Sequence, residues 1–101
     1  MSAMISPTVL KALIDFTGEP RVDIAVRLAL RDAARFKLEE LESALKRLEE
    51  KYRMIFPEFE RAFQNEEIPD TFSYEVEGDY LEWQGLRSRK KRVEDVLRWL
   101  E

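Results

Sequence analysis

The fold is decided by residues 38–55, LEELESALKRLEEKYRMI, in which apolar side chains recur at alternating spacings of three and four. That spacing places them along one side of an α-helix. The recurring positions are Leu38, Leu41, Leu45, Leu48, Tyr52 and Ile55. A stripe this narrow is typical of a helix that packs against a partner helix. We therefore expect residues 42–56 to continue a long helix as a packing seam.

The helix that carries this seam is expected to begin near residues 21–23 and to run to about residue 53. No Gly or Pro interrupts that stretch. Its apolar face is broader between Val22 and Phe36, which is typical of burial in a globular core. At about 1.5 Å per residue the helix would be roughly 45–50 Å long. A chain of 101 residues cannot bury that length alone, so the sequence predicts a homodimer through residues 7–41.

A first helix is expected over residues 7–17. Ser6 is a suitable N-cap, and Pro7 suits the first helical position. Gly18 is a natural residue to follow the last turn, and Pro20 prevents the helix from continuing.

Two further helices are expected near the C-terminus, over about residues 57–66 and 79–100. Between them, apolar residues alternate with polar ones at Phe72, Tyr74 and Val76. This alternation predicts a brief strand or extended segment that Gly78 ends. The expected fold class is all-α: a dimeric helical hairpin with one long central helix and C-terminal helices, with room for a very short N-terminal strand.

The sequence lacks the groups on which most catalytic and metal sites depend. It contains no histidine and no cysteine, which removes the commonest general base, the commonest metal ligand and any disulfide. Its three glycines are isolated, so there is no glycine-rich phosphate-binding loop. We expect no enzyme activity, no metal and no cofactor.

The sequence also contains no signal for a membrane. No stretch approaches the roughly 20 apolar residues that a membrane span needs, and residues 1–7 do not resemble a signal peptide. A cytoplasmic protein without a membrane partner is therefore expected. Side-chain amides are scarce and charges are dense, a composition found in many proteins of thermophiles.

Charge is distributed unevenly along the chain. Residues 58–82 contain nine acidic side chains and a single basic one, Arg61, whereas residues 83–101 contain six basic and three acidic side chains. One interpretation is that these charges pair with each other inside the molecule or between helices. The other is that the acidic segment binds a basic partner. The sequence leaves both open.

The N-terminal part of the chain, residues 6–41, contains the segments FTG at 16–18 and AVRLALR at 25–31. On these segments it resembles the ribbon-helix-helix repressors that act as antitoxins in prokaryotic two-gene toxin–antitoxin modules. The resemblance implies that residues 1–41 form a dimerisation region. Its shared core would contain Leu10, Leu13, Ile14, Val26, Leu30 and Ala33. The alternative is a generic helical hairpin.

DNA binding is expected to be weak at most. The family's ribbon is a basic or polar strand that enters the major groove, and residues 1–5 contain no Lys or Arg. Arg21 and Arg27, near the start of the second helix, are the first phosphate contacts to test.

The C-terminal part, residues 57–101 together with the end of the long helix, contains KYRM at 51–54, EFERAF at 58–63 and DYLEWQGL at 79–86. These segments are similar to a family of short prokaryotic antitoxin-type proteins that accompany small toxins expected to cleave RNA. The resemblance implies that the toxin is contacted, or the contact supported, by Tyr52, Phe59, Phe63, Tyr80, Glu82 and Trp83. The alternative is that these aromatic residues pack the last helix onto the long one.

The expected function is therefore that of an antitoxin that binds and neutralises a small cognate toxin. The competing hypothesis is a helical oligomerisation or adaptor module with neither a toxin nor DNA as a partner.

Overall fold

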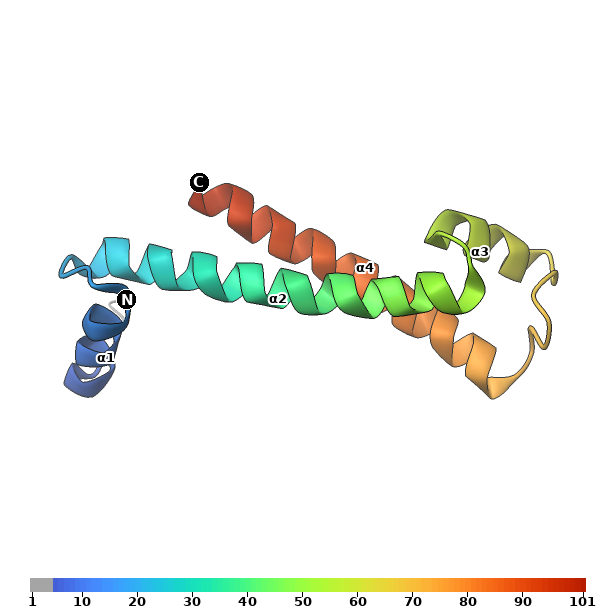
Figure 1. The fold of residues 1–101 in the computed structure, drawn as a ribbon, viewed down its shortest axis with the longest axis horizontal. Helices are drawn as coiled ribbons and strands as arrows, with labels where there is room; N and C mark the ends of the chain where they lie inside the picture. The colour runs from blue at the N-terminus through green and yellow to red at the C-terminus, as the bar shows by residue number, and fades with distance from the viewer. Residues whose placement is uncertain (1–4) are drawn as a thin grey trace.

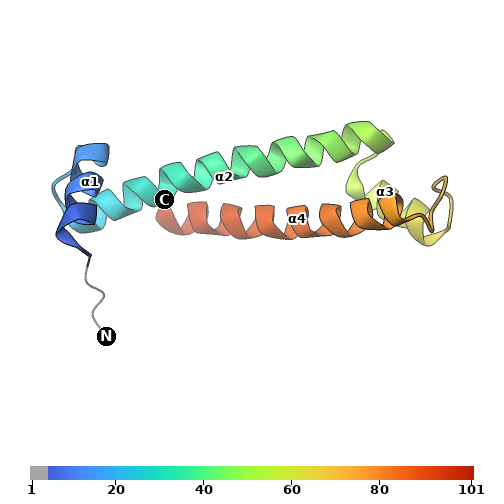
Figure 2. The same ribbon diagram turned by 90° about the horizontal axis from the view of Figure 1, so that it is seen from below.

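The computed structural model describes residues 5–101, and within them the regular elements are four α-helices and no strand. These are α1 (Pro7–Thr17), α2 (Val22–Tyr52), α3 (Phe56–Gln64) and α4 (Tyr74–Leu100). The molecule measures 56 × 23 × 20 Å. It is elongated because α2 and α4 lie antiparallel along its length, with α1 at one end and α3 at the other (Figures 1 and 2). The expected all-α class is confirmed.

The first two helices begin and end where local signals predict. The Ser6 hydroxyl accepts a hydrogen bond from the backbone N–H of Val9 at 3.2 Å, which caps α1. Gly18 follows α1 with a φ of 71° and donates its N–H to the carbonyl of Ile14. The predicted short N-terminal strand would fall on the residues before Ser6, and residues 1–4 lie outside the part of the chain that the structure describes.

The predicted strand or extended segment at residues 72–76 is wrong, because α4 begins at Tyr74. The Ser73 hydroxyl accepts a hydrogen bond from the N–H of Val76 at 3.2 Å and caps the helix. Glu75 and Glu77 lie in the first turn, where the helix dipole favours negative charge. Gly78, expected to end a strand, therefore lies inside α4.

The seam of α2 packs against α4 and α3 of the same chain. Leu41, Leu45 and Leu48 are buried on α2 and face a single core. Its other buried members are Phe56, Phe59, Ala62, Ile68, Val76, Trp83 and Leu86. The partner helix that this seam was predicted to need is α4, which returns along α2 after α3 (Figure 2). The predicted extent of the seam is wrong at its end, because α2 stops at Tyr52 and Ile55 is exposed at the N-cap of α3.

The N-terminal half has no comparable core. None of the residues of α1 is buried, and large apolar side chains such as Val9, Phe16 and Phe36 remain exposed. Of the expected dimer core, Leu10, Leu13, Ile14 and Val26 are half-buried, whereas Leu30 and Ala33 are exposed. The apolar face of α1 and the first half of α2 is therefore only partly covered within one chain.

Candidate functional site

The aromatic residues of the C-terminal half form one cluster. Its members are Tyr52 from α2, Phe56, Phe59 and Phe63 from α3, and Tyr80 and Trp83 from α4. Neighbouring ring centroids lie between 4.4 and 6.2 Å apart, the range in which aromatic pairs attract each other. Phe59 and Trp83 are its centre, with exposed fractions of 0% and 1%.

The structure places five of the six predicted partner-binding residues in this cluster. Phe59 and Trp83 have no surface to offer a partner, and so can only support a contact made by others. Tyr52, Phe63 and Tyr80 are half-buried. Glu82 is exposed on α4, outside the cluster. For Phe59 and Trp83, the structure agrees with the alternative interpretation, in which these aromatic residues pack the last helix onto the long one.

Polar contacts fasten the end of α2 to the start of α4. The Lys51 Nζ lies 2.6 Å from a carboxylate oxygen of both Glu75 and Asp79, and the Tyr52 hydroxyl donates a hydrogen bond to Asp79. Burial alone raises the pKa of Asp79, but the hydrogen bonds from Lys51 and Tyr52 outweigh this and leave that pKa below its ordinary value. On the other side of the cluster, the Tyr80 hydroxyl donates to Glu60 at 2.9 Å.

The phenol of Tyr52 makes stability sensitive to alkaline pH. Burial and the hydrogen bond to Asp79 raise the pKa of Tyr52 from 10.0 to about 12. Because the folded-state pKa lies above the unfolded one, the stabilisation is complete below about pH 10 and is lost as the pH rises towards 12. We expect Tyr52→Phe to lower the free energy of unfolding at pH 7 by about 1 kcal/mol and to flatten its fall between these pH values.

Urea unfolding followed by circular dichroism at several pH values measures this effect. Tyr74→Phe is the matched control, since Tyr74 is exposed. It should change the free energy of unfolding at pH 7 by less than about 0.5 kcal/mol. If the free energy of unfolding of Tyr52→Phe falls as steeply between pH 10 and 12 as that of the unmodified protein, Tyr52 is not the cause of the alkaline sensitivity.

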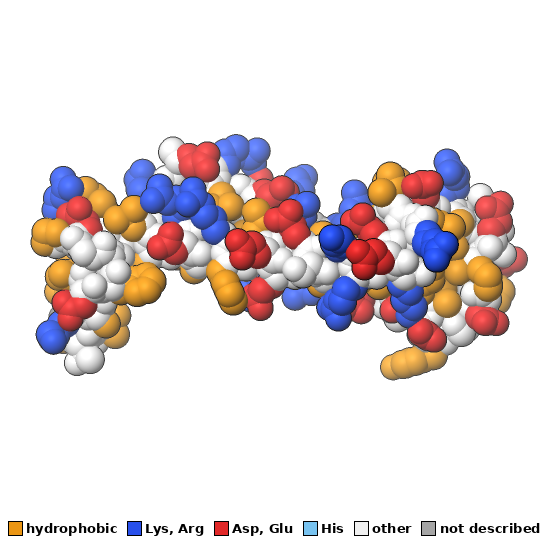
Figure 3. Space-filling view, viewed as in Figure 1, with side chains coloured by type: hydrophobic (Ala, Val, Ile, Leu, Met, Phe, Trp, Pro, Cys, Tyr) orange, Lys and Arg blue, Asp and Glu red, His pale blue; other side chains and the backbone are white. Residues whose placement is uncertain are grey.

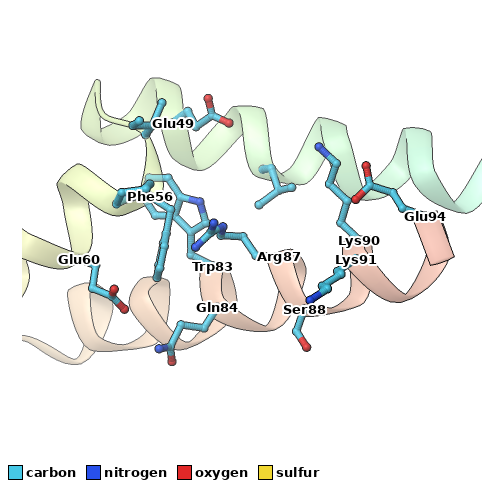
Figure 4. Close-up of a pocket in the computed structure, with 13 residues that line it drawn as sticks. Glu49, Phe56, Glu60, Trp83, Gln84, Arg87, Ser88, Lys90, Lys91 and Glu94 are labelled. Carbon is cyan, nitrogen blue, oxygen red and sulfur yellow. The ribbon is translucent and has the colours of Figure 1, made fainter.

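A groove of about 740 Å³ runs beside the aromatic cluster, between α2, the start of α3 and the middle of α4 (Figure 4). Phe56, Trp83 and Arg87 lie together on one side of it, and the Arg87 guanidinium stacks 4.7 Å from the centre of the Phe56 ring. The remaining charged lining is mixed: Glu49, Glu60, Lys90, Lys91 and Glu94. The charges that line the groove therefore favour neither an anionic nor a cationic ligand.

The acidic segment and the basic run of α4 do not pair with each other. Among residues 5–101, no salt bridge joins residues 58–82 to the run from Arg87 to Arg92. The ion pairs of the acidic segment go to Lys51 of α2 instead. Internal pairing thus accounts for only a small part of the acidic segment.

One feature of this region was not predicted from the sequence. Phe72, Tyr74 and Leu81 are exposed to 75%, 94% and 66%, although they are large and apolar or aromatic. The signal was present in the spacing, since Tyr74 and Leu81 are seven residues apart, as are the buried Val76 and Trp83. Figure 3 shows hydrophobic side chains that project among acidic ones at the end of the molecule where α3 lies.

The two arginines predicted to contact DNA differ in their surroundings. Arg21 lies at the N-cap of α2 and donates to both carboxylate oxygens of Glu19, at 2.8 and 3.1 Å. These hydrogen bonds lower the pKa of Glu19 to about 2. Arg27 is exposed on α2. To bind a phosphate, Arg21 would have to break its hydrogen bonds with Glu19.

The fold and surface define an elongated all-helical protein with an exposed acidic end and no helix, among residues 5–101, that is long and apolar enough to cross a membrane. Residues 19–101 match the model of the family described as the uncharacterized protein MJ0235 family, and the chain belongs to that family. The matched region contains α2, α3 and α4. No curated protein and no solved structure matches the chain.

Proposed function

We propose that this protein is an antitoxin-type inhibitor that binds and neutralises a small basic toxin through the end of the molecule formed by residues 52–86. The observation that carries the proposal is the acidic surface of residues 58–82. Of its nine carboxylates, only Glu75 and Asp79 form salt bridges with other residues among 5–101, and both bind Lys51. Glu58 and Glu60 accept hydrogen bonds from Ile55 and Tyr80. The remaining five carboxylates are exposed and available to a basic partner: Glu66, Glu67, Asp70, Glu77 and Glu82.

The charge of this surface suits an enzyme that acts on RNA. Such an enzyme needs basic residues to hold the phosphate backbone. An inhibitor whose acidic surface faces those residues gains association rate and excludes the substrate. A small RNA-cleaving toxin is therefore the class of partner proposed.

The N-terminal half is proposed to form a homodimer, a dimeric helical hairpin made by α1 and the first half of α2. The support is the face that one chain leaves only partly covered, in which Leu30 and Phe36 are exposed. Apolar surface of this kind is stabilised by burial against a second copy. DNA binding is proposed to be weak, because Arg21 is already held by Glu19.

The experiment is co-expression of the full chain with the product of the adjacent gene, which this proposal predicts to be a small basic protein. We expect the neighbouring product to arrest growth when expressed alone, and to copurify with this protein without arrest when both are expressed. If the two proteins do not bind each other, the antitoxin assignment is wrong, and the adaptor hypothesis is preferred.

Replacing Glu66, Glu67 and Glu77 together by Gln is expected to slow association with the toxin by roughly tenfold at low salt. The dissociation rate should change little, because these side chains are exposed and act at long range. Since salt screens such interactions, the difference from the unmodified protein should shrink near 0.5 M salt. Stopped-flow measurements at several salt concentrations provide the test.

The matched control replaces Asp32, Glu39 and Glu42 by the corresponding amides, which makes the same charge change on the exposed surface of α2. The association rate of this control should stay within about twofold of that of the unmodified protein, since these positions lie outside the acidic segment. An equal slowing in both variants would show that net charge, and not the proposed surface, governs association.

A further inference from the structure

We infer that Phe72, Tyr74 and Leu81 form the apolar contact by which this protein docks its basic protein partner, an inference that rests on the function proposed above. Phe59 and Trp83 cannot make this contact directly, because both are fully buried in the chain's own core. Exposed aromatic side chains surrounded by charge are typical of residues that dominate binding energy once a partner covers them.

The exposed side of α4 is fixed by its buried side. Val76 and Trp83 are buried seven residues apart, and this holds one face of the first part of α4 against the core. Tyr74 and Leu81 are also seven residues apart, and each lies two positions before a buried residue. At about 100° per residue this offset places them on the opposite face. They cannot turn inward without unpacking Trp83.

The loop before α4 holds Phe72 outward in the same way. Thr71 is buried, and its hydroxyl donates a hydrogen bond to the carbonyl of Ile68. Ser73 donates its N–H to the carbonyl of Asp70 at 2.8 Å and caps α4 with its side chain. Phe72 lies between these two anchored residues. An aromatic side chain presented by a fixed backbone loses less conformational entropy on binding.

Beside Phe72 lies a hollow of about 550 Å³ that shows the chemistry of the occupant. It is lined by Phe72 and by the acidic residues Glu66 and Asp70, together with the buried Ile68 and Thr71. A Lys or Arg side chain can place its aliphatic part against such a ring and its charge beside the carboxylates. The occupant is therefore a protein with basic side chains around an apolar contact.

The same charges disfavour other occupants. A two-fold symmetric contact with a second copy would bring the two acidic segments face to face, where they repel each other. Nucleic acids and anionic membranes carry the same sign of charge as this surface and are repelled as well. A basic protein is the partner that both the apolar contact and its acidic surroundings suit.

The test uses the full chain and, as the probe, the product of the adjacent gene. The variant carries Phe72→Ala, Tyr74→Ala and Leu81→Ala. Titration calorimetry or surface plasmon resonance is expected to show binding weakened by at least about 30-fold, chiefly through faster dissociation. Circular dichroism should show unchanged helix content, because all three side chains are exposed.

A matched control replaces Trp99 by Ala, which removes exposed apolar surface near the other end of α4, and should change affinity by less than about threefold. If the unmodified protein binds but the triple variant binds equally well, this inference is wrong and the proposed function stands. If the unmodified protein does not bind, both are wrong. If sedimentation shows that the triple variant loses self-association instead, the occupant is a second copy and the inference fails.

Discussion

Trp83→Ala is expected to lower the free energy of unfolding by about 3–5 kcal/mol, the range seen when a large buried aromatic residue is truncated. Trp83 contacts three other rings, with centroids 4.9 Å from Phe59, 5.5 Å from Phe56 and 6.0 Å from Tyr52. Its removal leaves a cavity at the point where α2, α3 and α4 meet. Since small domains are stable by only about 5–15 kcal/mol, the variant should be close to unfolding at physiological temperature.

The matched control is Trp99→Ala, which makes the same change on the same helix at a side chain that is 74% exposed. It should alter the free energy of unfolding by less than about 0.5 kcal/mol. Urea unfolding measured by circular dichroism distinguishes the two variants. Toxin affinity of Trp83→Ala should fall only in proportion to the folded fraction. A large loss of affinity with normal stability would mean that Trp83 contacts the partner directly.

Leu30→Asp is expected to convert the proposed dimer into a monomer at micromolar concentration. Leu30 is 49% exposed in the single chain, and in the dimer it would be covered by the second copy. A carboxylate there would be buried without a partner, which destabilises the dimer by roughly 3–5 kcal/mol. The monomer should keep most of its helix, because the core around Trp83 does not include Leu30.

Sedimentation velocity, with circular dichroism on the same samples, measures both effects. Leu81→Asp is the control, because Leu81 is exposed in the other half of the molecule, and this variant should remain dimeric. The dimer itself is wrong if the unmodified protein sediments as a monomer at micromolar concentration.

The helices that the sequence predicted well are those set by local signals. The bounds of α1 follow from Ser6 and Gly18, which act through hydrogen bonds and backbone preferences within one turn. The length of α2 follows from an uninterrupted apolar period. The start of α4 was missed because the alternation over residues 72–76 also fits a strand. This segment begins a helix because the Ser73 side chain caps its first turn.

Burial, in contrast, was decided only by tertiary structure. Phe59, Phe72 and Tyr74 lie within the acidic segment and Trp83 directly follows it. The spacing of such residues shows which of them share a helix face, but not which face is buried. The separation arises because α4 returns along α2 after α3 (Figure 2). Trp83 therefore packs into the core with the leucine seam, whereas Tyr74 remains exposed to solvent. Local sequence determined which residues are helical, because capping and periodicity act over one or two turns. Which helix faces are covered depended on contacts between residues far apart in the chain, and these exist only once the helices are packed.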